Sequence, residues 1–190
     1  MKFAAFALLL MLLPYTALAA PLPDNSIYHI ESPWLDQDAT PLMIGDLRGK
    51  VQVMAFIYTY CEHSCPVILS RLQRLESSLS AAQLTDVNFL LVSLDPQRDT
   101  PAVLQRYALD KSLDTQHWRL LNGAADDVLA LSALVGVRYQ PMDMEGKDIA
   151  HSNMITVLDP FGRVFYQMQG LAADPELVLQ AIVMAMQVTR

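Results

Sequence analysis

Cysteine and clustered positive charge are scarce in this sequence of 190 residues, which has two cysteines and 13 Lys and Arg against 20 Asp and Glu. No basic stripe occurs, so we expect no nucleic-acid partner, because binding to phosphates needs concentrated positive charge. Low-complexity runs and internal repeats are also missing, which argues against a disordered chain and against a repeat array. The composition is 53% hydrophobic, enough for a real core in one domain with a short appendage.

A long membrane-spanning run is missing as well. The apolar run at 3–13 follows a positive start at Lys2 and is shorter than the roughly 17–25 residues that cross a bilayer. A small-x-small signal, Ala17-Leu18-Ala19, comes next. We therefore predict a cleavable signal peptide over 1–19 and export to the periplasm, with an uncleaved anchor as the alternative. No cysteine follows the run, so we expect no lipoprotein attachment.

Two segments, Val51–Tyr58 and Val87–Leu94, are nearly continuously apolar, the pattern of strands buried on both faces of a sheet. Between them, an apolar stripe at helical spacing predicts a helix that begins just after Cys65, with Pro66 in its first position. A right-handed crossover through this helix would make the two strands parallel neighbours.

The rest of the chain continues the alternation of strands and helices. Asp159-Pro160-Phe161-Gly162 fits a type I turn and predicts a hairpin. The order predicts an α/β fold with a central mixed β-sheet flanked by helices and a C-terminal β-hairpin and helix. We expect a flexible lead-in with a short edge strand over 20–33 and the folded domain over 34–190. The further predicted segments are a short strand at 26–31, irregular chain at 34–48, a helix from Thr100 to Leu109, a strand at 118–121, a helix at 125–135, hairpin strands at 154–158 and 164–168, and a last helix opened by Asp174-Pro175.

The two cysteines, Cys61 and Cys65, lie on the loop that joins the first buried strand to its helix. A helix N-terminus favours anions and raises the thiolate fraction of a nearby cysteine. Thiolates are nucleophiles and soft metal ligands, so the position supports redox chemistry and metal binding alike. A disulfide across so small a loop would stabilise the fold little. The three-residue spacer is wider than the C-x-x-C of redox proteins and can place both sulfurs around one ion, while a disulfide between them is the alternative.

Two thiolates leave a copper or zinc ion short of donors, and imidazole is the natural third ligand. The chain has four histidines: His29, His63, His117 and His151. His63 lies inside the cysteine loop and is expected to face solvent, and His29 and His117 are expected at the surface or the core edge. His151 precedes the predicted hairpin, far from the cysteines in sequence.

Three ordered blocks resemble the Sco/SenC family of copper proteins. The first is Tyr58-Thr59-Tyr60-Cys61-Glu62-His63-Ser64-Cys65-Pro66, which resembles the C-x-x-x-C-P signature of the family. The second is Ser93-Leu94-Asp95-Pro96-Gln97-Arg98-Asp99-Thr100-Pro101, and the third is His151-Ser152 followed by Leu158-Asp159-Pro160-Phe161-Gly162. The resemblance implies a thioredoxin-like fold that binds copper, as Cu(I), Cu(II) or both, through Cys61, Cys65 and His151.

The resemblance also implies a role. It points to delivery of copper to the binuclear copper site of a respiratory oxidase, with a copper-receiving enzyme subunit as partner and another copper chaperone or a thiol–disulfide reductase as further partners. Membrane contact would then be indirect, through the partner. Three features depart from the family pattern: a cleavable signal is predicted where the family often has a membrane anchor, Ala150 stands where an acidic residue often precedes the histidine, and the spacer Glu62-His63-Ser64 is unusual.

A second hypothesis is a periplasmic thiol–disulfide oxidoreductase that uses Cys61 and Cys65 as a redox-active dithiol on the cysteines of a copper-enzyme target. His151 discriminates between the two, because copper binding needs it and dithiol exchange does not. We expect a binding protein rather than an enzyme. Peroxide reduction is a weaker third hypothesis, since no supporting motif for a peroxidatic cysteine is present.

Two further pairs of residues have side chains that could join such a site. Asp95 and Asp99 follow the second buried strand, where they could orient a ligand or a partner. The favoured interpretation is a turn, with Asp99 or Thr100 capping the next helix. Met142 and Met144 carry soft thioether donors, but packing in the core or at the surface is the expected role of both.

Overall fold

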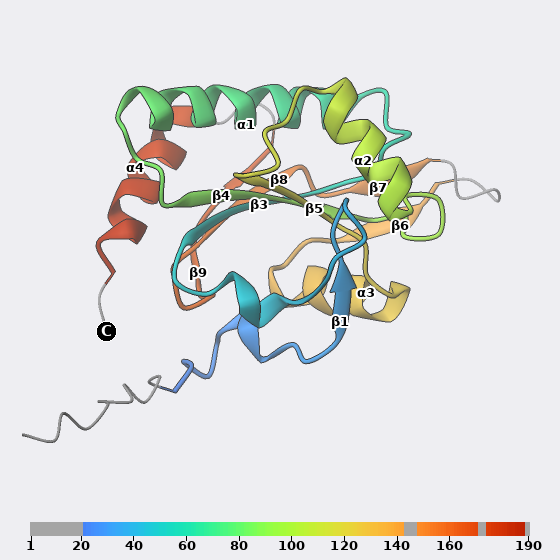
Figure 1. The fold of residues 1–190 in the computed structure, drawn as a ribbon, viewed down its shortest axis with the longest axis horizontal. Coiled ribbons are helices and arrows are strands. Elements are labelled where there is room, and N and C mark those ends of the chain that lie inside the picture. The colour runs from blue at the N-terminus through green and yellow to red at the C-terminus, as the bar shows by residue number, and fades with distance from the viewer. Residues whose placement is uncertain (1–20, 143–147, 171–173, 189–190) are drawn as a thin grey trace, which may run out of the picture.

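The computed structural model describes residues 21–142, 148–170 and 174–188. Its centre is a five-stranded sheet in the order β5-β4-β3-β8-β9. The strands are β3 (Val51–Ile57), β4 (Val87–Ser93), β5 (Trp118–Leu121), β8 (Met154–Leu158) and β9 (Val164–Gln169). The first three are parallel, and β8 and β9 continue the sheet antiparallel (Figure 1). The predicted mixed sheet and its C-terminal hairpin are confirmed.

Strand β3 is the central strand, and all seven of its residues are buried. It pairs with β4 from Val51↔Val87 to Ile57↔Ser93, as the apolar pattern of both segments predicts. Its one polar residue, Gln52, is accommodated because its side-chain amide donates to the carbonyl oxygen of Leu47 at 2.9 Å. Neighbours on both edges and on both faces leave β3 few ways to shift its register.

Helices cover both faces of the sheet (Figure 1). One face carries α1 (Ser64–Ala81), α2 (Pro101–Asp110) and α4 (Pro175–Met186), and the other carries α3 (Ala125–Leu134). Alternate residues of β3 divide between two cores: Val53 packs with the first group and Met54 with the second. This alternation follows from the period of a strand, whose successive side chains point to opposite faces.

The segment 26–31 was expected to be an edge strand, and this prediction is wrong. It contains a short 3-10 helix, η1 (Ile27–His29). The Ser26 hydroxyl accepts a hydrogen bond from the backbone N–H of Tyr28 at 3.1 Å, which favours a turn over an extended chain. The lead-in docks on the β8–β9 turn, since Ser26 Oγ donates to the carbonyl oxygen of Phe161 at 2.5 Å and Ile27 N donates to that of Gly162 at 3.0 Å.

The segment 34–48 was expected to be irregular, and it is instead ordered. It contains β1 (Pro33–Leu35) paired antiparallel with β2 (Pro41–Met43), followed by the 3-10 helix η2 (Ile44–Leu47). The anchor of this unit is Trp34, which is 1% exposed and packs in the same core as α3. Strands of three residues carry too few alternating positions to be recognised as a pattern.

Helix boundaries differ from the predicted ones by one or two residues. Helix α1 begins at Ser64, so Cys65 lies inside its first turn and Pro66 is its third residue. Proline is still tolerated there because the first N–H groups of a helix have no intrahelical partner. The last helix begins at Asp174-Pro175 as predicted, and the Asp174 side chain caps it by accepting from Glu176 N.

The β8–β9 turn lies at the amino end of β3. Gly162 N donates to the carbonyl oxygen of Asp159 at 2.9 Å, the bond expected of the predicted turn. Gly49, just before β3, donates to the carbonyl oxygen of Pro160 at 2.9 Å. The lead-in therefore docks at the end of the sheet opposite to the carboxyl end of β3.

Among the described residues, no helix combines the length and apolarity that crossing a membrane requires. The predicted signal peptide, 1–19, lies outside these residues.

Candidate metal centre

The thiol loop, residues 58–63, joins the carboxyl end of β3 to the start of α1. It turns at once, because Cys61 N donates to the carbonyl oxygen of Tyr58 at 3.1 Å. Cys65 is 1% exposed and belongs to the apolar core on the α1 face of the sheet, while Cys61 is only half-buried. One thiol therefore belongs to the core and the other to the surface.

His151 reaches the site from a two-stranded sheet that the sequence did not predict. It is the last residue of β7 (Ile149–His151), which pairs antiparallel with β6 (Tyr139–Pro141). Tyr58 links this small sheet to the thiol loop: its hydroxyl accepts from Ile149 N at 3.4 Å. The Tyr58 ring also meets the His151 imidazole edge to face, with ring centroids 6.1 Å apart. These contacts hold the imidazole against the loop.

The donor atoms of Cys61, Cys65 and His151 all lie within 4.8 Å of one another. The Cys65 sulfur is 3.7 Å from Nε2 of His151, and Cys65 N donates to the Cys61 sulfur at 3.4 Å. Both cysteines are free. In the described part of the chain, no other group of three His, Cys, Asp or Glu side chains converges in this way.

The His151 ring is oriented by its second nitrogen. Nδ1 lies 3.3 Å from the carbonyl oxygen of Ser152, so it carries the proton, and the lone pair of Nε2 faces the Cys65 sulfur. Burial lowers the pKa of His151, which favours the neutral imidazole. A neutral imidazole whose outer N–H is held by a carbonyl has the arrangement typical of a metal-binding histidine.

The two thiols have opposite electrostatic surroundings. Burial raises the pKa of Cys61, but hydrogen bonds from the Cys65 amide and thiol, the His63 amide and the Ser64 hydroxyl outweigh it, and the pKa falls to about 7. Burial, together with the hydrogen bond to Cys61, raises the pKa of Cys65 above its ordinary range. In the metal-free protein, Cys61 is therefore the thiol that ionises first, and Cys65 is the thiol that donates to it.

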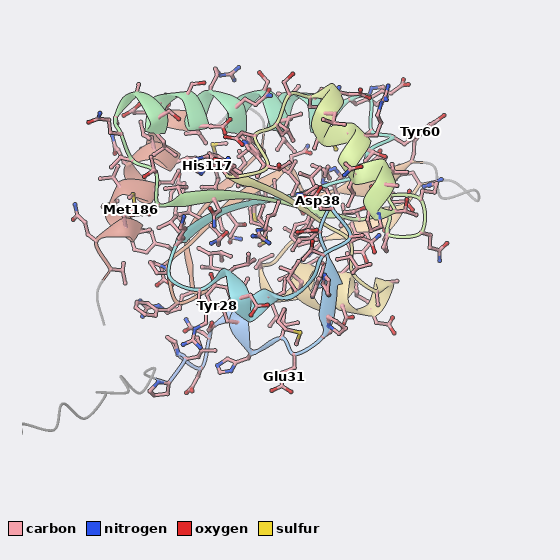
Figure 2. All side chains as sticks on the ribbon, in the orientation of Figure 1. Tyr28, Glu31, Asp38, Tyr60, His117 and Met186 are labelled. Carbon is pink, nitrogen blue, oxygen red and sulfur yellow. The ribbon has the colours of Figure 1, made fainter. Side chains whose placement is uncertain are left out.

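The imidazoles of the other histidines are not part of this cluster. His63 is exposed and His29 is exposed, with its Nε2 2.9 Å from the carbonyl oxygen of Pro23. His117 is half-buried beside Glu76, on the far side of the molecule from Tyr60, the neighbour of Cys61 (Figure 2). The expected surface or core-edge positions of these three residues are confirmed.

The turn expected after β4 is present, since Arg98 N and Asp99 N donate to the carbonyl oxygen of Asp95 at 3.1 and 2.9 Å, and of the two expected caps of α2 it is Thr100, not Asp99, that occupies the position. Thr100 occupies the N-cap position without a side-chain bond, and the Asp99 carboxylate instead accepts from Thr59 and Ser93. Asp95 forms an ion pair with Arg98. Sequence reasoning missed the contact of Asp99 with the thiol loop, because only the parallel pairing of β3 and β4 brings Thr59 and Asp99 together.

Met142 is 64% exposed and so lies at the surface, one of the two positions expected of it, and Met144 lies outside the described residues. A surface depression of about 390 Å³ opens beside the imidazole. Its lining consists of Arg138, Tyr139, Gln140, Ala150, His151 and Ser152. The site can thus be approached from the β6–β7 side.

The donor set decides which chemistry these residues can support. Two sulfurs and one imidazole nitrogen are soft to borderline ligands, which suit Cu(I), Cu(II) or Zn(II) rather than Mg²⁺ or Ca²⁺. Without a metal, a thiolate beside a second thiol is also the starting point of disulfide exchange.

Comparison with known proteins agrees with this geometry. The family model described as SCO1/SenC matches residues 28–187. The "SCO1 protein homolog" of Bacillus subtilis is 28% identical over 141 residues, which cover 74% of this chain and 72% of that protein. In seven further relatives, the matched segment spans between 35% and 63% of their length.

Solved structures show the same thioredoxin-like architecture. Yeast Sco1 with copper bound is 25% identical, with a TM-score of 0.68, and the match covers 80% of this chain and 84% of that chain. BsSco, described as a member of the Sco family of cytochrome c oxidase assembly proteins with a disulfide switch, is 24% identical, with a TM-score of 0.72 over 85% of this chain and 95% of that one. The match over nearly the whole described chain settles the assignment: the chain belongs to the SCO1/SenC family.

Proposed function

We propose that this protein is an exported copper-binding protein that holds the ion on Cys61, Cys65 and His151 and delivers it to the binuclear copper site of a respiratory oxidase. The single observation that carries the proposal is the convergence of these three donor atoms within 4.8 Å. The copper is cargo, and the protein's task is to bind it, protect it and release it to the receiving subunit.

The geometry favours copper in both oxidation states. Cu(I) prefers soft sulfur and accepts low coordination, so the two thiolates supply most of its binding. The imidazole nitrogen supports Cu(II). The partner would approach over the half-buried Cys61 and the depression beside His151, since the Cys65 side is closed by the core.

Two relatives support the identity of the ion and of the recipient. Yeast Sco1 was solved with copper bound, and BsSco is a cytochrome c oxidase assembly protein. The predicted signal peptide over 1–19 supports a site of action outside the cytoplasm, where such an oxidase subunit would be met.

A second candidate function is thiol–disulfide exchange. The lowered pKa of Cys61 favours it, because a half-buried thiolate next to a second thiol can attack a disulfide, with Cys65 then resolving the mixed disulfide. The target would be the cysteines of the same oxidase subunit, so the two functions can serve one assembly step.

The test is a copper titration of the reduced protein, its His151→Ala variant and the matched control His63→Ala. Wild type should show a strong sulfur-to-Cu(II) charge-transfer absorption. Losing a residue that only holds a metal ligand in place typically weakens metal binding by about 10–100-fold. Losing His151, a direct ligand, should therefore weaken Cu(II) binding by at least about tenfold. His63 belongs to the thiol loop, but its imidazole is exposed to solvent. The His63→Ala variant should therefore keep the Cu(II) absorption spectrum and the Cu(II) affinity of wild type.

Two outcomes separate the candidates. Loss of the Cu(II) absorption in His151→Ala, with Cu(I) binding and disulfide exchange retained, supports the copper site. An unchanged Cu(II) spectrum and affinity in His151→Ala would remove His151 from the site and favour the oxidoreductase.

A further inference from the structure

A buried carboxylate lies directly beneath the thiol loop. Asp99 is 1% exposed and accepts three hydrogen bonds: from Thr59 N at 3.1 Å, Thr59 Oγ1 at 2.5 Å and Ser93 Oγ at 2.6 Å. Burying a carboxylate is costly unless donors surround it, so both Thr59 donors are part of what allows Asp99 to be buried. Asp99 thereby joins the chain after β3 to the last residue of β4.

Asp99 is itself held from two sides. Its backbone N–H donates to the carbonyl oxygen of Asp95 at 2.9 Å. Its carbonyl oxygen accepts from the side-chain amide of Asn122, just past β5, at 2.9 Å, and the same amide donates to Pro96 O at 2.8 Å. The backbone of Asp99 is therefore fixed to the carboxyl ends of β4 and β5. Its hydrogen-bond partner Thr59 belongs to the loop that carries Cys61, so the carboxylate ties that loop to the sheet.

We propose that Asp99 is a positioning residue of the thiol loop, which holds Thr59 and through it sets the distance of Cys61 from Cys65 and His151. Thr59 lies two residues before Cys61, so a shift of Thr59 moves the Cys61 sulfur. Cys65 and His151 are held by other elements, α1 and β7, and would not follow. No hydrogen bond of Asp99 reaches the three donor atoms. Burial is the main cause of the raised pKa of Cys65, and the Asp99 charge adds to it, whereas the position of Cys61 depends on the hydrogen bonds of Asp99 to Thr59. The effect on copper rests on the proposed function, but the effect on the two thiols does not.

The hydrogen-bond pattern gives a conservative variant. In Asp99→Asn, the amide oxygen can take the place of Oδ2 and accept from Thr59 N and Ser93 Oγ, while the amide nitrogen donates to Thr59 Oγ1. All three contacts persist and the charge is lost. Asp99→Ala loses all three, and Thr59→Val loses the hydroxyl contact alone.

The control is a second buried carboxylate at the opposite end of the sheet. Asp159 is 1% exposed and accepts from Phe161 N at 2.9 Å, Arg163 N at 3.0 Å and Arg163 Nε at 2.6 Å. Asp159→Ala removes a carboxylate of equal burial without touching the thiol loop. This variant shows how much a general loss of stability changes Cu(II) affinity and the equilibrium of the thiols with glutathione.

Two properties are measured for each variant: Cu(II) affinity with its charge-transfer spectrum, and the equilibrium of the metal-free thiols with glutathione. In the second, one glutathione disulfide and the protein dithiol yield the Cys61–Cys65 disulfide and two glutathione thiols. Asp99→Ala should weaken Cu(II) binding by roughly 10–100-fold and shift the thiol equilibrium towards the dithiol by about tenfold, because the two sulfurs are no longer held together. Asp99→Asn should stay close to wild type, and Thr59→Val should fall between.

The proposal is overturned if Asp99→Ala matches wild type in both readouts, if Asp159→Ala loses as much as Asp99→Ala, or if Asp99→Asn loses as much as Asp99→Ala. If Asp99→Ala does not fold, Thr59→Val decides alone: an unchanged thiol equilibrium overturns the proposal, and a shifted one supports it. A wild-type protein that binds no copper would refute the proposed function, and the thiol equilibrium would still test Asp99.

Discussion

At the scale of single residues, the two thiols differ although they are only four positions apart in the sequence. Cys61 is half-buried and receives hydrogen bonds from the start of α1, whereas Cys65 is enclosed by apolar side chains. Helix N-termini lower the pKa of a thiol that faces their N–H groups, and burial raises the pKa of one that packs behind them. The start of α1 thus gives the two thiols different acidities.

The reactivity of the metal-free protein should follow this difference. We expect iodoacetamide to modify Cys61 before Cys65. Because the Cys61 pKa is about 7, its rate should rise as the pH increases through 7, rather than through the ordinary thiol range near 8.5. Peptide mass spectrometry after timed alkylation from pH 5 to 9 checks this. The Cys61→Ser variant should react slowly throughout, and faster labelling of Cys65 in wild type would contradict the assignment.

The sequence was sufficient to predict both cysteines of the cluster but not the way in which its histidine is held. The C-x-x-x-C spacing at a strand-to-helix junction is local, so it can be recognised from neighbouring residues. The contacts of His151 with Cys65 and Tyr58 are long-range and depend on β6 and β7, which are too short to show a pattern. The resemblance to a family supplied this residue, and the fold then explains its position. The contact of Asp99 with Thr59 was missed for the same reason, since the two residues are distant in sequence.

At the scale of secondary-structure elements, long apolar segments were predictable and short ones were not. β3 and β4 are seven-residue strands buried almost throughout, and their sequences indicate as much. η1 depends on the hydrogen bond to the Ser26 hydroxyl, and β1 depends on the burial of Trp34. Neither contact produces a periodic pattern in the sequence. Tertiary packing therefore decides these elements more than local preference does.

The β8–β9 turn offers a test of how firmly the lead-in docks. Gly162 has φ +78°, and an added Cβ would lie 2.7 Å from the Tyr28 ring and 2.8 Å from Ser26 Oγ. Gly162→Ala should cost about 1–2 kcal/mol from the left-handed backbone, plus the cost of displacing the lead-in. Gly49 has φ +93° with nothing within 4 Å of its added Cβ, so Gly49→Ala carries the backbone cost alone.

Urea unfolding of the two glycine variants measures the difference. We expect Gly162→Ala to be the less stable, with earlier proteolysis in the segment 21–30. Equal unfolding free energies would mean that η1 contributes nothing to stability.

At the scale of the whole molecule, copper binding should be linked to unfolding. The three donors come from the thiol loop, from α1 and from β7, so the unfolded chain lacks the assembled site. A ligand that binds only the folded state stabilises it by about 2.7 kcal/mol at a hundredfold excess over its Kd. For a domain of this size, that is roughly 5–10 °C in Tm.

Thermal unfolding with and without Cu(II) checks this linkage. The rise should appear in wild type, disappear on addition of a chelator and be smaller in His151→Ala. A rise of equal size in a Cys61→Ser/Cys65→Ser double variant would place the stabilising ion elsewhere.

The docking of the lead-in on the β8–β9 turn has a geometric consequence. That turn and the thiol loop lie at opposite ends of β3, and seven residues of strand span about 20 Å. Ser26 and Ile27 are attached to the turn, so a surface that held the protein by this segment would leave Cys61 and His151 on the remote side. The sheet would then keep the metal site at a fixed distance from that surface. A tether at the lead-in could then limit where the protein diffuses without obstructing the face that a partner must reach.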